Sequence, residues 1–213
     1  MNTTLHYFYD PLCGWCYAAA PLIQAACTIP NLNIQLHAGG LWVDTQVKPI
    51  TPELRAYVLA NDARIAQISG QTFGEAYQNG LLQRTDVVLN SEPPIRAIRV
   101  AQSLSNQGLA MLQRIQIAHF IEGRAVSQSA TLLEIASELG LNHNAFADAY
   151  TNAHAQTQAH LHDTRELMHA WRINGYPNLI LQRDEQYLNV PHTTFYDQPS
   201  AFAHALEAAI HAD

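Results

Sequence analysis

A pair of cysteines near the start of the chain, Cys13 and Cys16, constrains the fold more than any other feature. An apolar run at residues 5–9 precedes the pair and is typical of a buried strand. A helical pattern over residues 17–27 follows it. Two cysteines separated by two residues, at the start of a helix that follows the first strand, indicate a thiol redox motif.

The position of this motif at a helix N-terminus favours ionisation of its first thiol. The first backbone N–H groups of a helix have no partner within the helix, and together with the helix dipole they favour a negative charge. We therefore expect Cys13 to be the exposed thiol that attacks disulfides as a thiolate. Cys16 lies one turn farther along, where its sulfur can reach the first, and we expect it to be the resolving thiol.

The alternatives to a redox pair are a zinc site and a chance pair of structural cysteines. A zinc site usually needs four ligands. Cys27 is the only other cysteine, and no second CxxC or HxxxH pair completes a zinc finger. The sequence therefore predicts no metal site. We expect Cys27 to be a small buried residue rather than a third redox thiol.

Composition and charge exclude several classes of function. With 213 residues, 48% of them hydrophobic, the chain can bury a sizeable core. Its 11 Lys and Arg against 18 Asp and Glu give a net charge of -7, which argues against nucleic acid or an anionic membrane as a partner. No stretch reaches the roughly 18 apolar residues of a transmembrane helix. No signal peptide is visible, so we expect a cytoplasmic protein. In a reducing compartment, three cysteines with two in one motif favour a catalytic role over a disulfide framework.

The first part of the chain has the pattern of a βαβ unit. Strands are predicted at residues 3–9 and 33–37, on either side of the helix that begins at the cysteine motif. Gly39 and Gly40 end the second strand, and residues 41–50 are predicted to form a loop.

Helix after helix follows, from Thr51, an N-cap with proline after it, to about residue 171. This block includes a predicted helical segment at residues 75–82 and a capping box that begins at Thr131. Strand patterns then return as a hairpin, and an amphipathic helix closes the chain. These last segments are residues 178–182, 186–190 and 198–211.

Without the helical block, the order βαβ…ββα is that of a thioredoxin-like fold, and the whole chain resembles the DsbA-like branch of that superfamily. The motif Gly175-Tyr176-Pro177, immediately before the hairpin, carries the resemblance together with the CxxC pair. In this family a cis-proline precedes that strand and packs beside the cysteines, so the resemblance implies a cis Tyr176–Pro177 bond. It also implies an α/β fold with a discontinuous thioredoxin-like domain, residues 1–50 and 171–213, and an inserted all-helical domain, residues 51–170.

Within the family the chain looks closest to the cytoplasmic protein-disulfide isomerases and the FrnE-like group. Gly14 and Trp15 stand between the cysteines where periplasmic DsbA has Pro-His. The imidazole that helps to stabilise the DsbA thiolate is absent, so we expect a weaker oxidant. By resemblance, Trp15, Tyr176 and Pro177 contact the substrate.

Together these features predict a thiol–disulfide oxidoreductase or isomerase that acts on protein or small-molecule disulfides. It needs no cofactor besides the Cys13–Cys16 pair, but it needs a redox partner that regenerates the pair, and glutathione can serve as an exchange partner. One alternative is a glutathione-dependent enzyme of the kappa transferase or 2-hydroxychromene-2-carboxylate isomerase type, which the intact cysteine pair disfavours. The other is a partner-binding protein with idle cysteines.

The histidines are less informative than the cysteines. His6 lies on the first strand, and we expect a hydrogen bond to a neighbour rather than a role as proton acceptor for Cys16. The histidines of the long helix before residue 171, such as His160, form no clear stripe, so we expect them to face solvent.

Overall fold

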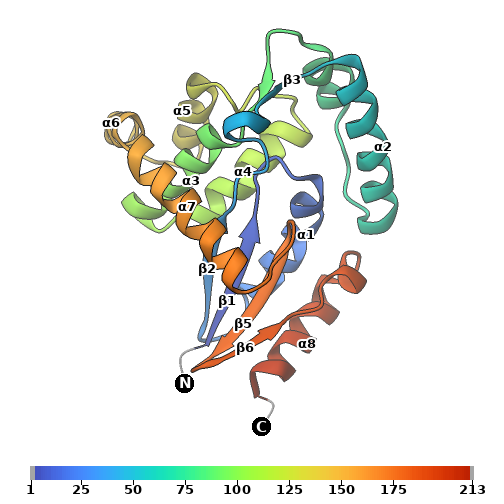
Figure 1. Ribbon diagram of the computed structural model, residues 1–213, viewed down its shortest axis with the longest axis vertical. Coiled ribbons are helices and arrows are strands. Elements are labelled where there is room, and N and C mark those ends of the chain that lie inside the picture. The colour runs from blue at the N-terminus through green and yellow to red at the C-terminus, as the bar shows by residue number, and fades with distance from the viewer. Residues whose placement is uncertain (1–2, 212–213) are drawn as a thin grey trace.

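The computed structural model describes residues 3–211, and its centre is a four-stranded mixed sheet (Figure 1). In spatial order its strands are β2 (Leu32–Ala38), β1 (Thr3–Tyr9), β5 (Asn178–Arg183) and β6 (Gln186–Asn189). β1 runs parallel to β2, with Leu5 opposite Ile34, and antiparallel to β5, with Leu5 opposite Leu181. The two ends of the chain therefore meet on either side of β1, as the predicted βαβ unit and hairpin require.

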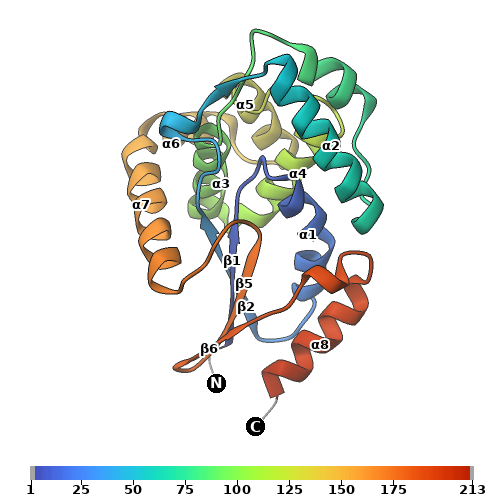
Figure 2. The same ribbon diagram turned by 45° about the vertical axis from the view of Figure 1, so that its right-hand side comes forward.

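Helices make up most of the remaining chain. They are α1 (Gly14–Ala26), α2 (Pro52–Ser69), α3 (Glu92–Ser105), α4 (Gly108–Phe120), α5 (Ser129–Glu138), α6 (His143–Asn152), α7 (His154–Ala170) and α8 (Pro199–His211). α1 packs against α8 beside one face of the sheet, whereas α7 packs against β2. Figures 1 and 2 both show α2 to α6 at the end of the sheet where β1 leads into α1. Within residues 3–211, none of these helices is long and apolar enough to cross a membrane.

β1 is buried on both faces because its residues alternate between two hydrophobic clusters. Tyr7 and Tyr9 belong to the main core, which also includes side chains of α1, α3, α4 and α8. Phe8 lies in a second cluster with Met168 of α7 and Ile180 of β5. A strand covered on both faces reads as a continuous apolar run, which explains the clear strand signal in the sequence.

The helical block differs from the predictions in its details. Residues 75–82 do not form a regular helix, because the chain makes a π-helical turn at Ala76–Gly80. α5 begins at Ser129, two residues before the predicted capping box. The predicted N-cap at Thr51 is confirmed, since its hydroxyl accepts from the N–H of Leu54 (3.2 Å).

Short elements were also absent from the predictions. The predicted loop at residues 41–50 contains a two-residue strand, which pairs with a second two-residue strand that follows α2 in the chain. Strands of this length give no alternation that a sequence pattern can reveal. The short elements are β3 (Lys48–Pro49), β4 (Val88–Leu89) and 3-10 turns at Asp44–Gln46, Leu81–Gln83 and Thr193–Phe195.

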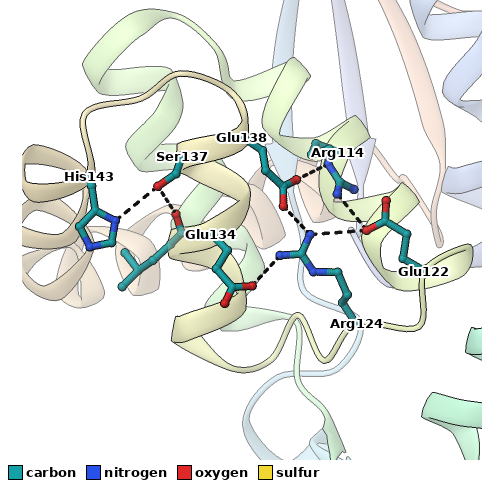
Figure 3. A network of polar contacts seen from close by, with 8 residues as sticks. Arg114, Glu122, Arg124, Glu134, Ser137, Glu138 and His143 are labelled. Carbon is teal, nitrogen blue, oxygen red and sulfur yellow. Dashed lines mark hydrogen bonds and ion pairs between the residues drawn. The ribbon is translucent and has the colours of Figure 1, made fainter.

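A network of ion pairs connects α4, α5 and the loop between them at the surface (Figure 3). Glu138 of α5 accepts from Arg114 of α4 (2.6 Å) and from Arg124 of the connecting loop (2.7 Å). Glu122 and Glu134 complete it through the same two arginines. Exposed pairs contribute at most about 1 kcal/mol each, so each of these contacts adds little to the stability of the protein.

Candidate active site

The predicted attacking cysteine stands at the N-cap of α1. The backbone of Cys13 is extended, its N–H donates to the carbonyl of Asp10 (3.2 Å), and its carbonyl accepts from the N–H of Tyr17 (3.0 Å). The thiol therefore precedes the first turn of α1, where backbone N–H groups favour a negative charge. The prediction that Cys13 is exposed is wrong, because only 8% of its surface is exposed. Side chains of α2 and of the loop after β2 share the cavity that the residue lines.

Cys16 is fully buried one turn farther along α1. Its thiol is hydrogen-bonded to that of Cys13, and it accepts from the backbone N–H of Asp10 (3.5 Å). Both cysteines are free thiols, so the structure represents the reduced pair. Burial, and then the neighbouring Cys13, raise the pKa of Cys16. Burial thus favours the protonated form of the deeper thiol.

The Tyr176–Pro177 bond is cis, as the resemblance implies. The carbonyl of Tyr176 accepts a hydrogen bond from the Cys13 thiol (3.7 Å), so the segment before β5 lies against the motif. The Tyr176 ring lies so close to Gly39 that a Cβ atom there would overlap it. The glycine at the end of β2 is therefore what lets this ring fit beside the sheet.

A cavity of about 160 Å³ adjoins Cys13. Helix α2 supplies one wall of it, and the loop after β2, strand β4 and the end of α4 supply others. The lining residues are Leu12, Cys13, Gly14, Trp15, Leu41, Trp42, Tyr57, Val58, Asn61, Asp62, Ile65, Tyr77, Leu89, His119 and Phe120. The cavity that leads to Cys13 thus lies between the motif and the helical block.

Trp15, predicted to contact substrate, lines this cavity. Its ring packs against Tyr196 (5.5 Å between centroids), and the guanidinium of Arg64 on α2 lies 6.0 Å from its centroid. Tyr176 approaches Cys13 through its backbone carbonyl, and Pro177, the next residue, is buried. Of the predicted substrate-contacting residues, Trp15 thus lines the cavity beside Cys13, and Tyr176 lies next to the thiol through its carbonyl.

Asp10, just before the cysteine motif, is a residue of the site that was not predicted from the sequence. Its carboxylate is fully buried and accepts from the N–H groups of Leu12 (2.8 Å) and Leu41 (2.6 Å) and from the hydroxyl of Ser91 (3.0 Å). These bonds tie the motif loop to the segment after β2 and to the start of α3. The sequence did contain a signal for the first of these bonds, because an Asp side chain often accepts from the backbone N–H two residues later, in an Asx-turn.

Asp62 on α2 is a second missed residue. It lies on the cavity wall, 5% exposed, and accepts from the phenol of Tyr77 (3.0 Å). Burial raises its pKa to about 7, although the hydrogen bond from Tyr77 lowers it. Nothing in the sequence marked it, because α2 has a mostly exposed surface and Asp62 resembles its other polar residues.

His6 behaves as predicted for a strand histidine. Its Nε2–H donates to the side-chain carbonyl of Gln182 (2.8 Å), which leaves Nδ1 to accept from His37 (2.9 Å). The prediction for His160 was wrong. Its Nε2 accepts from the N–H of Ala38 (3.1 Å), because α7 packs against β2.

Cys27 is exposed at the C-cap of α1, so the prediction that it is buried was wrong. Ala26 takes the last core position of the helix, and Cys27 falls one residue beyond it. Within residues 3–211, no group of three or more His, Cys, Asp or Glu side chains is placed to hold a metal ion.

Comparison with known families and structures identifies the fold. The model of the DSBA-like thioredoxin domain matches residues 4–206. The chain belongs to this family. The predicted family and the α/β thioredoxin-like fold class are therefore confirmed. A comparison with curated protein sequences gave no significant match.

Among solved structures, the cytosolic disulfide reductase DsbM from Pseudomonas aeruginosa is 42% identical, covers 97% of this chain and 98% of its own, and superposes with a TM-score of 0.92. The same reductase has also been solved with GSH (39% identity, 98% and 100% covered, TM-score 0.91).

More distant structures share the fold alone. A 2-hydroxychromene-2-carboxylate isomerase is 16% identical (97% and 94% covered, TM-score 0.58), and reduced DsbA1 from Neisseria meningitidis is 12% identical (98% and 84% covered, TM-score 0.55). Because an isomerase and an oxidoreductase both have this fold, the fold does not decide between the two activities.

Proposed function

We propose that this protein is a thiol–disulfide oxidoreductase that reduces disulfides, with Cys13 as the nucleophile and Cys16 as the resolving thiol. The observation that carries the proposal is the adjacent Cys13–Cys16 pair at the N-terminus of α1, with the carbonyl of Tyr176 beside the first thiol. Reduction is favoured over oxidation because the similar DsbM is described as a disulfide reductase. The absence of an imidazole between the cysteines also favours it.

The reaction proceeds in two exchanges. The Cys13 thiolate attacks one sulfur of a substrate disulfide, a Cys13–substrate disulfide forms, and the other substrate sulfur leaves with the bonding electron pair and takes up a proton. Cys16 then loses its proton and attacks the Sγ of Cys13, which releases the second substrate thiolate. The substrate gains two electrons, and the Cys13–Cys16 pair becomes a disulfide. Trp15 and Tyr176 lie beside Cys13, and together with Pro177 they are proposed to contact the substrate.

The oxidised pair must be reduced again before the next turnover. Glutathione is the proposed exchange partner, since a structure of the similar DsbM contains GSH. The same relative is described as cytosolic, and we propose that this protein also works in a reducing compartment. An isomerase role would use the same first exchange, followed by attack of a second substrate thiol in place of Cys16.

Three cysteine variants test the proposal. Cys13→Ser should abolish reduction of a peptide disulfide, Cys16→Ala should accumulate the mixed disulfide, and the matched control Cys27→Ser should react as the wild type does. The readouts are thiol release and mass spectrometry of the trapped adduct. Full activity in Cys13→Ser would refute the mechanism, and absence of any adduct in Cys16→Ala would refute the resolving role.

The reduction potential separates this proposal from its alternatives. Equilibration with glutathione buffers should give a value nearer that of thioredoxin, about -270 mV, than that of DsbA, about -120 mV. If no disulfide formed between the two cysteines at any ratio of glutathione to its disulfide, the protein would not be a redox enzyme. A glutathione-dependent isomerase or transferase, or a partner-binding protein, would then be favoured.

A further inference from the structure

The carboxyl group of Asp62 is held against the cysteine motif by a helix of the inserted block. A Cβ atom built on Gly14 would lie 3.0 Å from its Oδ1 and 2.7 Å from the Cδ1 of Ile65. Gly14 is the residue immediately after the attacking cysteine. The missing side chain at this position therefore leaves room for a carboxyl oxygen beside the first turn of α1.

The two oxygens of this carboxyl have different surroundings. Oδ2 accepts the hydrogen bond from Tyr77, whereas Oδ1 is the oxygen that lies nearest Gly14. Asp62 and Cys13 line the same cavity of about 160 Å³. A water molecule takes up about 30 Å³ of liquid, so the cavity has room for the sulfur of a departing thiol.

Among the groups that face Asp62, Tyr77 favours the carboxylate through its hydrogen bond, but burial outweighs that bond and raises the pKa. α1 contributes Cys13, the turn after α2 contributes Tyr77, and α4 contributes His119 to the same wall. Burial lowers the pKa of His119 to about 3, so this imidazole is neutral, and its Nδ1 is buried without a hydrogen-bond partner. The remaining titratable group on the wall, Tyr57, is largely exposed. With a pKa of about 7, Asp62 is present in both forms near neutral pH.

We propose that Asp62 is the proton donor for the sulfur that leaves in the first exchange, an inference that rests on the proposed disulfide reductase function. The bond between Cys13 and the first substrate sulfur forms as the substrate disulfide breaks. The second sulfur leaves with the bonding electron pair, and the protonated carboxyl gives it a proton. Asp62 becomes a carboxylate and takes a proton back from solvent through the cavity.

This role depends on the chemistry of the leaving thiol. An alkyl thiolate has a high proton affinity and leaves slowly, so protonation assists it, whereas an aromatic thiolate of low pKa leaves without a proton. Loss of a proton donor therefore slows exchange with an alkyl disulfide and spares exchange with an aromatic one. A defect in folding or packing slows both alike.

The experiment measures single-turnover oxidation of the reduced protein by two disulfides. One is oxidised glutathione, and the other is the aromatic dithiobis(nitrobenzoic acid). All variants carry Cys27→Ser, because that exposed thiol would otherwise react with the aromatic reagent. The key variant is Asp62→Asn, whose side-chain carbonyl can still accept from Tyr77. Tyr77→Phe is the matched control, since it removes that hydrogen bond and keeps the carboxyl.

Asp62→Asn should slow the reaction with oxidised glutathione about a hundredfold at pH 6, the modest end for a proton donor, and change the aromatic reaction less than about twofold. Tyr77→Phe should retain the wild-type ratio of the two rates. In the wild type alone, the alkyl-to-aromatic ratio should fall as the pH rises through 7, so the test does not depend on how the variant folds.

Equal slowing of both reactions by Asp62→Asn, together with a pH-independent rate ratio in the wild type, would overturn the role of Asp62 while leaving the proposed function intact. If neither reagent oxidised Cys13 and Cys16 of the wild type to a disulfide, the proposed function would be overturned, and this inference with it.

Discussion

Replacing Asp10 by asparagine should change the stability of the protein by an amount that depends on pH. Asp10 is fully buried, and burial raises its pKa from 3.8 to about 6. Its hydrogen bonds from Leu41, Leu12 and Ser91 lower the pKa but do not offset the burial. Between about pH 4 and 6, the folded protein therefore holds a proton on this carboxyl that the unfolded chain has lost.

The sign of the effect follows from this difference in bound protons. The stabilisation linked to a raised carboxyl pKa is fully present below pH 3.8 and is lost as the pH rises through about 6. A difference of about 2 between the two pKa values corresponds to about 3 kcal/mol. Of this, about 2 kcal/mol falls between pH 4.5 and 7.5.

An asparagine at this position cannot ionise, so the Asp10→Asn variant lacks this pH-dependent contribution. Its amide can accept with one atom only, and either the N–H of Leu12 or that of Leu41 then loses its partner, at a cost of about 1–3 kcal/mol at any pH. The variant should therefore be destabilised at both pH values. The loss of stability should be about 2 kcal/mol larger at pH 4.5 than at pH 7.5.

Urea unfolding of the reduced proteins at the two pH values measures this difference, and contributions from other titrating groups cancel between variant and wild type. Ser91→Ala is the control with the opposite sign. It removes a hydrogen bond that favours the ionised carboxyl, so its destabilisation should be larger at pH 7.5. If Asp10→Asn lost the same stability at both pH values, the buried carboxyl would not have the raised pKa on which this reasoning depends.

Three further substitutions test how the site and the helical block are packed. Gly39→Ala places a Cβ atom against the Tyr176 ring and should cost about 1–3 kcal/mol in urea unfolding, with slower disulfide exchange because the carbonyl beside Cys13 moves. Gly14→Ala should cost about 1 kcal/mol, since the nearest atom is the flexible end of Ile65; no loss of stability would contradict the close approach of α2. Arg124→Ala should cost less than about 1 kcal/mol, and 1 M NaCl should abolish that cost if the ion pairs are surface contacts.

The parts of this fold that the sequence predicted are those with a strong local signal. β1 gives a continuous apolar run because it is covered on both faces, and the cysteine pair marks the start of α1. Thr51 and the proline after it mark the start of α2. The cis bond at Pro177 was inferred from family resemblance, because local chemistry alone makes cis proline a minority state.

The parts that the sequence did not predict depend on which segments meet in space. Asp10 is buried only because the loop after β2 and the start of α3 close over it. Asp62 is buried only because α2 lies against α1. Cys27 was expected in the core, but a helix leaves the core at its end regardless of how apolar its last side chain is. No periodicity within one segment reports on such contacts.

The dipeptide between the cysteines also packs against helix α2. In the sequence, Gly14 is a departure from the Pro-His of DsbA, and it bears only on the redox potential. In the structure, the space that a side chain at this position would need is occupied by Ile65 and Asp62. The same helix α2 covers Cys13 and brings a titratable carboxyl to its cavity. We therefore expect a bulkier residue at position 14 to move α2, and Asp62 with it, away from the cysteine motif.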